Sequence, residues 1–598
     1  MIADVAFAVP RPHPFAYRVP EGWRLAPGQR VLAPLHGAHR AGIVVAVRAG
    51  DAPGLKTPTR VLDPAPVVGA AGLDLARWIA EESLSSLGST LAALLPPPPV
   101  IAADVTRPRA RAGELTLSTG AGRERRLLER LAMAPGRALV IAPDVEAAGR
   151  WAQRLGKLGP VARLDSGIPD SERAEGWRRV SAGDARLGVG TRSALLVPLG
   201  EDATVALVDE HEIAHKPPGP PRMHSRDVVL RRAATEGASV LLISATPSCE
   251  AWCVAAEGRA GIDGGEPAAW PTVQLADTRG ILRREPLTPA LARALRETLA
   301  AGRRAVVLVS RLTSALACDE CGSVLRCPDC ALTLAYWRAR AALECRVCGR
   351  TLPLPETCAQ CGGRRLTPFG WGIERVEHAV RRRFPNVKVA RFDPEAARGA
   401  RGQAQRAAAV DADIVVGTRG ALKLFGPAAL GAVGLVTPDQ LLRAPDFRAG
   451  ERTFALLWSA AERVATGGAM VVQTSDPSHY AFDAVARQDL AAFYARELPF
   501  RRELGYPPFR RLAVVTVIGG GTQARRLADD VSAALSGAPG TTVYPPASDA
   551  RGRRRRVVVK GGGDLPAVLG QALGELMSPR PKSRGIIDVE VDPVEWQF

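Results

Sequence analysis

Four Cys-x-x-Cys pairs fall within one short stretch of the chain, between residues 318 and 361. Two residues between the cysteines let both sulfurs of a pair reach one tetrahedral metal ion, and four sulfurs close a structural zinc site. The stretch therefore predicts two zinc ions that stabilise a small insertion and leave no open position for a catalytic water. Iron–sulfur clusters use the same ligands, but glycine-rich paired knuckles favour zinc ribbons. The pairs are Cys318/Cys321, Cys327/Cys330, Cys345/Cys348 and Cys358/Cys361.

The rest of the chain changes its hydrophobic pattern from segment to segment. Near the start, short alternating runs such as QRVLAPL and AGIVVAVRAG are separated by Gly and Pro, which predicts a small β-rich domain. From residue 106 onward, apolar runs such as RALVIAP and SVLLISA alternate with helical stretches, the pattern of a parallel α/β sheet. A second series of this kind follows a helix signalled by Thr288 and Pro289, and the cysteine stretch interrupts it after its first strand.

We therefore predict a multidomain α/β protein, since 598 residues are enough for several hydrophobic cores. The predicted parts are an N-terminal β-rich domain at 1–100, a first lobe at 106–285, a second lobe at 286–500 with the cysteine insertion at 315–365, and a small α+β C-terminal domain at 501–598.

The net charge favours a polyanionic partner. The chain has 79 Lys and Arg against 61 Asp and Glu, a formal charge of +18, and a pI near 10.1. Nucleic acid is the expected partner, although general enrichment in arginine would give the same balance. No run approaches the ~18 apolar residues of a membrane span, and no basic leader precedes an apolar run, so we expect a cytoplasmic protein with no membrane partner.

An ordered series of motifs resembles the PriA family, the primosomal proteins N′ that restart replication at abandoned forks. The cysteine spacing and its position match that family's zinc insertion. The other matching stretches are PFAYRVPEG near the start, GTRSALLVP at 190–198, PRMHSRD at 221–227, SATPS at 244–248, PDFRAGERT at 445–453 and RRELGYPPFRRLA at 501–513.

The resemblance implies an N-terminal DNA-binding domain, two RecA-like helicase-type lobes with a zinc-ribbon insertion in the second, and a C-terminal DNA-binding domain. It implies binding to forks and to single-strand/duplex junctions. The implied partners are primosome proteins, the loader of the replicative helicase and the single-stranded DNA-binding protein, with association to the nucleoid at forks. The family's winged-helix domain is expected to be missing, because only about ten residues separate Pro99 from Arg109.

The family's zinc pairing, carried over to this sequence, joins the outer cysteine pairs in one site and the inner pairs in the other. The first zinc would be held by Cys318, Cys321, Cys358 and Cys361, and the second by Cys327, Cys330, Cys345 and Cys348.

The nucleotide site of the family is altered in this sequence. The phosphate loop Gly-Ser-Gly-Lys-Thr appears as Gly120, Ala121, Gly122, Arg123 and Glu124, and the Lys and Thr that would hold phosphate and Mg²⁺ are absent. The acidic pair Asp209 and Glu210 is kept. The arginine motif Gly-Arg-Ala-Gly-Arg appears as AERVATG, which keeps Arg463 and places Thr466 at the second arginine. Of a further motif, Gly417, Thr418 and Lys423 are kept. No adenine-reading glutamine is found.

These departures predict a pseudo-helicase: a restart protein that recognises abandoned or stalled forks and promotes reloading of the replicative helicase without ATPase activity, with ATP binding in doubt. An active ATP-dependent 3′ to 5′ helicase and a generic zinc-ribbon nucleic-acid-binding protein are the alternatives. Taken alone, residues 118–129 also fit a glycine-bearing turn, and Asp209 and Glu210 fit an acidic pair that caps a helix.

Two clusters are candidate DNA contacts. Phe15, Tyr17 and Arg18 lie in the domain that the resemblance assigns to a DNA strand end, where stacking and phosphate contacts are expected. The run Arg553, Arg554, Arg555 and Arg556 is expected to lie along phosphates, with a solvated strand edge as the alternative. The irregularly spaced His211, His215 and His224 are expected on a solvated surface.

Overall fold

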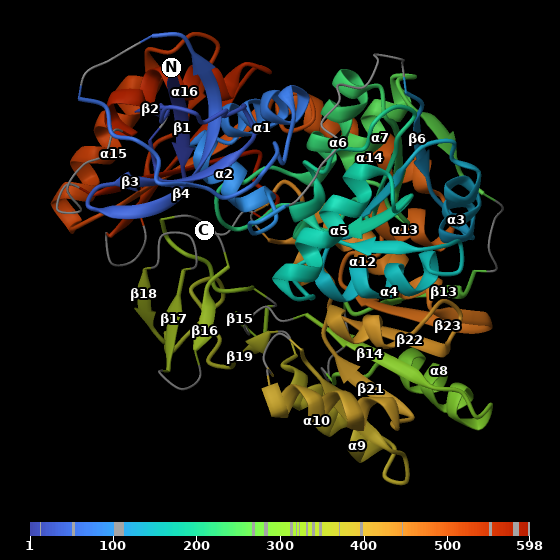
Figure 1. The fold of residues 1–598 in the computed structure, drawn as a ribbon. Helices are drawn as coiled ribbons and strands as arrows, with labels where there is room; N and C mark the ends of the chain where they lie inside the picture. The colour runs from blue at the N-terminus through green and yellow to red at the C-terminus, as the bar shows by residue number, and fades with distance from the viewer. Residues whose placement is uncertain are drawn as a thin grey trace.

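The structure is a computed structural model of the chain. It describes residues 1–598 with the exception of 12, 51–53, 101–112, 266–269, 280–284, 311–314, 319, 322, 330–332, 338–340, 346–349, 370, 395–396, 398, 445, 549–552, 578–584 and 596–598. Figure 1 shows the N-terminal segment in blue beside the C-terminal segment in red, with two α/β lobes on the other side and the yellow-green strands of the cysteine insertion extending away from them.

The N-terminal domain is an antiparallel sheet with strand order β2-β1-β4-β3-β5, followed by two helices. Alternating side chains such as Val5, Phe7 and Tyr17 fill its interior. A tight turn with positive φ at His36 and Gly37 joins β3 to β4, as a two-residue hairpin requires. The bounds are β1 Ile2–Phe7, β2 Phe15–Arg18, β3 Arg30–Leu35, β4 Ala38–Arg48, β5 Arg60–Val61, α1 Ala70–Glu82 and α2 Leu87–Leu94.

Lobe 1 is a parallel sheet with strand order β12-β6-β11-β10-β7-β9-β8. Its central strands are buried throughout because helices cover both faces, which explains why they are continuously apolar in the sequence. The bounds are β6 Leu115–Ser118, α3 Arg123–Met133, β7 Ala138–Ile141, α4 Val145–Leu155, β8 Val161–Arg163, α5 Asp170–Ala182, β9 Leu187–Gly190, β10 Thr204–Val208, α6 Ser225–Glu236, β11 Ser239–Ile243, α7 Cys249–Ala256 and β12 Gly261–Asp263.

Lobe 2 is a second parallel sheet, with strand order β13-β23-β22-β14-β21-β20. Strand β13 pairs with β23 of this sheet, so the boundary between the lobes lies before residue 272 and not at 285 as predicted. A short strand in an exposed part of the sequence gives no sign of which sheet it will join. The bounds are β13 Thr272–Asp277, α8 Pro289–Ala300, β14 Ala305–Val309, α9 Ile373–Arg383, β20 Val389–Phe392, α10 Gly399–Val410, β21 Ile414–Gly417, β22 Leu430–Val436, α11 Asp439–Leu442, α12 Ala449–Glu462, β23 Val464–Thr474, α13 Tyr480–Ala486 and α14 Leu490–Glu503.

The cysteine insertion lies between β14 and α9 of lobe 2 and forms two small antiparallel sheets, β15-β19 and β16-β17-β18. The bounds are β15 Ala315–Cys318, β16 Ala335–Trp337, β17 Ala342–Glu344, β18 Thr351–Pro353 and β19 Leu366–Phe369. The sequence correctly predicted an insertion into the second lobe.

The C-terminal domain is an α+β unit with strand order β25-β27-β24-β28 and β26 beside β27. Helices α15 and α16 cover one face of this sheet, and their apolar side chains pack against the strands. The bounds are β24 Arg511–Ile518, α15 Gly521–Ser536, β25 Thr542–Val543, β26 Ala547–Ser548, β27 Arg554–Gly561, α16 Leu565–Met577 and β28 Ile586–Val591.

The N-terminal domain packs directly on lobe 1. Ile79 and Leu91 of its helices belong to the same buried cluster as Trp177 and Val240 of lobe 1, and the Trp177 indole N–H donates to the Val67 carbonyl at 3.3 Å. The segment expected to lack a winged helix falls largely on residues 101–112, outside the described residues. Because β6 begins at Leu115, too few residues remain there for such a domain. Among the described helices, none combines the length and hydrophobicity of a membrane span.

Candidate functional site

The loop between β6 and α3 has the backbone of a glycine-dependent turn. Gly120 and Gly122 have φ angles of 69° and 70°, a left-handed region that favours glycine. A Cβ at Gly120 would lie 2.0 Å from the Gly264 carbonyl oxygen. The Arg126 guanidinium holds the loop from one side by donating to the carbonyls of Ala121 and Thr119, both at 2.5 Å. The glycines are therefore required by this turn.

Arg123, the first residue of α3, pairs with a residue of lobe 2. Its guanidinium donates to both carboxylate oxygens of Glu462 at 2.7 and 3.0 Å and to the Gly120 carbonyl at 3.0 Å. Both side chains are mostly buried, with 17% and 16% of their surface exposed. Burial lowers the pKa of Arg123, but the charge and hydrogen bonds of Glu462 outweigh it, so the net pKa is raised. The cation is kept charged by a carboxylate from lobe 2.

The acidic pair Asp209 and Glu210 follows β10, where strand ends meet the cleft. Asp209 has a φ of 51°, unusual for a residue other than glycine, and desolvation raises its pKa against the influence of His211 and Arg123. Glu210 is fully buried and accepts hydrogen bonds from Arg226 at 3.1 Å and from the Ser248 hydroxyl at 2.6 Å. Glu210 is therefore committed to partners inside lobe 1, whereas Asp209 is close enough to Arg123 for that cation to oppose the rise in the pKa of Asp209.

Other residues of the predicted nucleotide site take partners outside the loop. The Glu124 carboxylate pairs with Arg154 of α4, so its charge is paired outside the loop. Arg463 donates to the Leu422 carbonyl at 2.7 Å and to Ser459, and remains within lobe 2. The structure therefore brings together Gly120, Gly122, Arg123 and Asp209, with Glu462 added, and Arg463 lies near enough for burial and the charge of Arg123 to lower its pKa.

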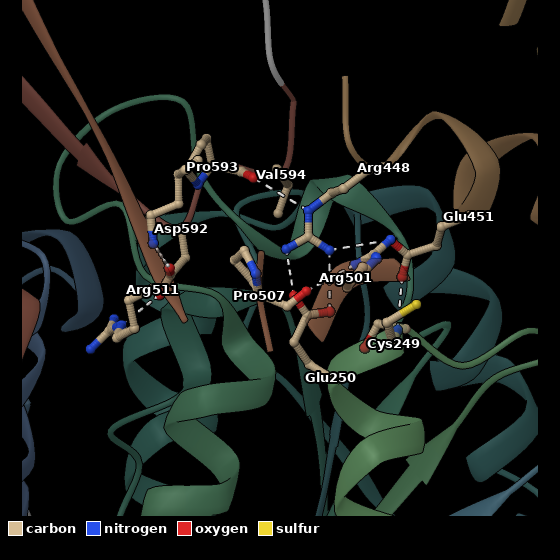
Figure 2. A network of polar contacts seen from close by, with 12 residues as sticks. Cys249, Glu250, Arg448, Glu451, Arg501, Pro507, Arg511, Asp592, Pro593 and Val594 are labelled. Atoms are coloured by element: carbon tan, nitrogen blue, oxygen red, sulfur yellow. Dashed lines mark hydrogen bonds and ion pairs between the residues drawn. The ribbon is translucent and has the colours of Figure 1, made fainter. Parts of the chain in front are cut away.

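A second contact between the lobes centres on the buried guanidinium of Arg448, shown in Figure 2. It donates to both oxygens of Glu250 of lobe 1, at 2.5 and 3.2 Å, and to Glu451 of α12, the helix that Arg448 precedes, at 3.2 Å. It also donates to the carbonyl of Pro593, after β28, at 3.4 Å. We call Arg448, Glu250, Glu451 and Arg501 the inter-lobe joint.

Further contacts strengthen the inter-lobe joint. Arg501 donates to Glu451 at 2.8 Å, and Glu451 accepts the backbone N–H of Cys249 at 2.8 Å, again across the lobes. The ring of Tyr494 stacks on Trp252 with centroids 4.3 Å apart. A cleft with an empty volume of about 790 Å³ opens beside the joint, where lobe 1, lobe 2 and the C-terminal domain meet.

Sequence reasoning missed the partners that make these contacts. Glu462 lies next to Arg463 in AERVATG, where only the arginine was considered, and Arg448 lies inside PDFRAGERT, which served only as a family marker. Their partners are hundreds of residues away, and no local pattern signals such a pairing.

Two of the three histidines lie inside the protein, contrary to the prediction of a solvated surface. His215 is 2% exposed and its Nε2 lies 2.8 Å from the Val208 carbonyl. Burial lowers the pKa of His215 to about 4 and that of His224 well below its usual value. Both are therefore neutral core histidines, and their irregular spacing reflects a loop that folds back into lobe 1.

The outer cysteines of the insertion come together in a group that could hold a metal ion. Their sulfurs all lie within 4.8 Å of one another, and four thiolates are the donor set of a structural zinc site. The backbone N–H of Gln360 lowers the pKa of Cys358 to about 7, which favours the thiolate that binds metal. The group consists of Cys318, Cys321, Cys358 and Cys361.

Half of the inner cysteine set can be placed. Cys327 and Cys345 are buried in one small cluster of the insertion, whereas Cys330 and Cys348 lie outside the described residues. The ligand set and the metal of this second site stay predictions.

The candidate DNA contacts of the N-terminal domain differ in exposure. Phe15 is half-buried and Arg18 is exposed, whereas the Tyr17 ring is buried and its hydroxyl donates to the Pro34 carbonyl at 2.8 Å. Arg11 lies 5.7 Å from the Phe15 ring centroid. The accessible candidates are therefore Phe15 and Arg18, with Tyr17 supporting the sheet beneath them.

The four consecutive arginines lie at the start of β27, with Arg553 and Arg554 exposed and Arg555 and Arg556 half-buried. Successive residues of a strand point to opposite faces. Arg555 shares its parity with the buried Val557 and Val559, so it belongs to the face that α15 and α16 cover. Arg554 and Arg556 belong to the opposite face.

Comparisons with known proteins match both ends of the chain to one family. A family model described as the PriA 3′DNA-binding domain (3′BD) matches residues 4–96. A second, described as the primosomal protein N C-terminal domain, matches residues 502–594.

Similar proteins are replication restart proteins PriA. The protein of Treponema pallidum is 30% identical over 569 residues, covering 85% of each chain. That of Bacillus subtilis is 32% identical over 419 residues, covering 67% of this chain, and the match spans only about half of the relative, 52%. Among solved structures, RecG bound to a three-way DNA junction has a TM-score of 0.35 and 12% identity, covering 72% of this chain and 45% of that chain.

These comparisons contradict the prediction that the chain is a pseudo-helicase without ATPase activity. The Treponema pallidum relative matches 85% of this chain and is named a replication restart protein PriA, and the resemblance to that family implies an ATP-dependent DNA helicase. The prediction counted side chains that differ from the family's motifs and assumed that each disables the loop. The geometry does not support that assumption for Glu124, whose charge is paired with Arg154 of α4.

Proposed function

The chain belongs to the PriA family of replication restart proteins, and from that premise we propose that it recognises abandoned or stalled forks, binds branched DNA and promotes primosome assembly and reloading of the replicative helicase. The observation that carries the proposal is the match to Treponema pallidum PriA over 85% of both chains, with a DNA-binding domain model at residues 4–96. The site of action is the replication fork in the cytoplasm.

The proposed partners follow from this role. They are forked DNA and single-strand/duplex junctions, other primosome proteins, the loader of the replicative helicase and the single-stranded DNA-binding protein. The net charge of +18 supports the polyanionic partner. Two zinc ions are proposed to stabilise the insertion, since the clustered outer cysteines fit one such ion.

A binding assay tests the proposal. Forked, duplex and single-stranded DNA with equal numbers of phosphates are compared, each with and without ATP, at one fixed salt concentration, because non-specific binding depends strongly on salt. We expect the fork to bind most tightly and to recruit purified helicase loader. Equal affinity for the three DNAs, with no recruitment, would leave a generic nucleic-acid-binding protein.

ATP-driven translocation or unwinding, the activity of the family's helicases, is the second candidate function. The glycine turn before α3 and the position of Asp209 beside it favour this candidate. DNA-stimulated phosphate release is the measurement. Turnover that Asp209→Asn abolishes would establish it, and Asp202→Asn is the matched control because Asp202 also has a φ of 51° but lies on an exposed turn. Asparagine tolerates this conformation at both positions.

A further inference from the structure

An acidic side chain of lobe 2 is paired with the arginine that ends the glycine turn of lobe 1. Glu462 ends α12, and its two carboxylate oxygens lie on the guanidinium of Arg123, the first residue of α3. A helix N-terminus favours negative charge, which is why phosphate groups bind there. The carboxylate therefore lies where an anionic ligand of the loop would be attracted.

This pair is one of several that cross the cleft. Lys423 of lobe 2 lies 3.6 Å from Asp144 of lobe 1, and Arg406 lies 3.7 Å from Glu146. These two pairs are more exposed than the pair of Arg123 and Glu462, so salt screens them more. The inter-lobe joint connects the two lobes at a second place. Side-chain ion pairs therefore connect the lobes both at the glycine turn and at the inter-lobe joint.

We propose that Glu462 is a latch: it is a built-in anionic occupant of the phosphate loop that keeps the two lobes closed without nucleotide, and a phosphate-bearing ligand binds at Arg123 only by displacing it. The arginine motif of the family begins with glycine at this position, so the carboxylate is a property of this chain and not of the family's motif. The proposal is independent of the role at forks.

Competition explains how the latch would act. A bidentate arginine–carboxylate pair satisfies the guanidinium fork, and a phosphate needs the same donors. The bound ligand must therefore release the Glu462 carboxylate from Arg123. Ligand binding and the loss of this contact between the lobes are coupled through one side chain.

The experiment compares Glu462→Gln with Glu129→Gln in the full-length protein. Glu129 and Arg125 both lie on α3, the helix that Arg123 begins, and form an exposed pair there. This pair does not connect the two lobes. Two readouts are made: the affinity for inorganic pyrophosphate by calorimetry, and hydrogen exchange of the backbone amides in residues 119–126 and 458–463.

We expect Glu462→Gln to bind pyrophosphate at least about tenfold more tightly than the parent protein, the effect of removing one charged hydrogen-bonding competitor. Amides of both segments should exchange faster, because the lobes open. Glu129→Gln should match the parent in both readouts. The exchanged pair Arg123→Glu with Glu462→Arg should restore the slow exchange without binding pyrophosphate, which separates the latch from a general loss of folding.

Unchanged pyrophosphate affinity in Glu462→Gln, relative to Glu129→Gln, overturns the competition. Unchanged exchange in both segments overturns the closure. The single variants Arg123→Glu and Glu462→Arg are checked for folding by circular dichroism. If both are folded and the exchanged pair still does not restore slow hydrogen exchange in the two segments, the latch is overturned.

Discussion

Arg448 accounts for three connections of the chain with a single guanidinium. Its acceptors come from lobe 1, from α12 of lobe 2 and from the segment after β28. Burial raises the pKa of Glu250, but Arg448 and Arg226 outweigh it and hold that pKa well below its usual value. The pair is therefore charged inside the protein, and removal of one partner leaves the other charge poorly solvated.

Arg448→Ala should lower the free energy of unfolding by about 3–5 kcal/mol, the usual cost of breaking a buried ion pair. Urea denaturation followed by circular dichroism measures the change. Arg259→Ala is the control, because Arg259 pairs with Glu257 at the surface, with 64% and 51% of the two side chains exposed, and such pairs contribute about 1 kcal/mol or less. A loss for Arg448→Ala no larger than that of the control would contradict a stabilising joint.

At the scale of elements, β27 explains why consecutive arginines are not equivalent. The sequence run suggested four parallel phosphate contacts, but the pleat places Arg554 and Arg556 on the face opposite the helices and Arg555 on the covered face. A strand of this kind can place alternate arginines along one DNA backbone.

Arg554→Ala with Arg556→Ala should make the dependence of DNA affinity on salt shallower by about 0.9 per lost phosphate contact on duplex DNA. The measurement is the slope of log affinity against log salt concentration. Arg525→Ala with Arg526→Ala removes the same charge from α15, on the other layer of the domain, and should leave the slope unchanged. Equal slopes in both double variants would mean that β27 does not meet phosphates.

The cysteine insertion is the element whose folding we expect to depend on metal. Its described strands are three to four residues long, and such short strands bury too little apolar surface to be stable alone.

Elemental analysis of the purified protein should therefore give two zinc ions per chain, and Cys318→Ser should lose one of them and expose the insertion to proteolysis. Cys253→Ser, a substitution in lobe 1 away from the insertion, should retain both. Iron in place of zinc, or an unchanged zinc content in Cys318→Ser, would contradict the assignment.

Strands and helices of the lobes were predictable because their signals are local. Buried parallel strands appear as continuous apolar runs, so RALVIAP and SVLLISA identify β7 and β11, and Thr288 with Pro289 marks the start of α8. The outer cysteines also come together as the family's pairing implied. The predicted boundary placed the residues of β13 in the first lobe, because the sequence of a short strand does not indicate which strand it will pair with.

At the scale of the whole molecule, the contacts that unite the parts could not be predicted. Arg123 and Glu462 are 339 residues apart, and Lys216 donates to the Asp592 carbonyl, 376 residues away. Such pairs are set by how separately folded layers meet, which depends on the shapes of all of them. The same limit applied to the buried His215, whose loop folds inward so that the His215 Nε2 lies 2.8 Å from the Val208 carbonyl.

The buried cluster shared by the N-terminal domain and lobe 1 bears on how the chain can be divided. A fragment ending near residue 100 would keep the buried interior of its own sheet but would expose Ile79 and Leu91 to solvent. The remaining chain would expose Trp177 and Val240. Each fragment alone would be prone to aggregate through this exposed apolar surface. If the two fragments were co-expressed as separate chains, each would bury the apolar surface of the other. The boundary is therefore suited to a split-protein reporter whose halves reassemble without a covalent link.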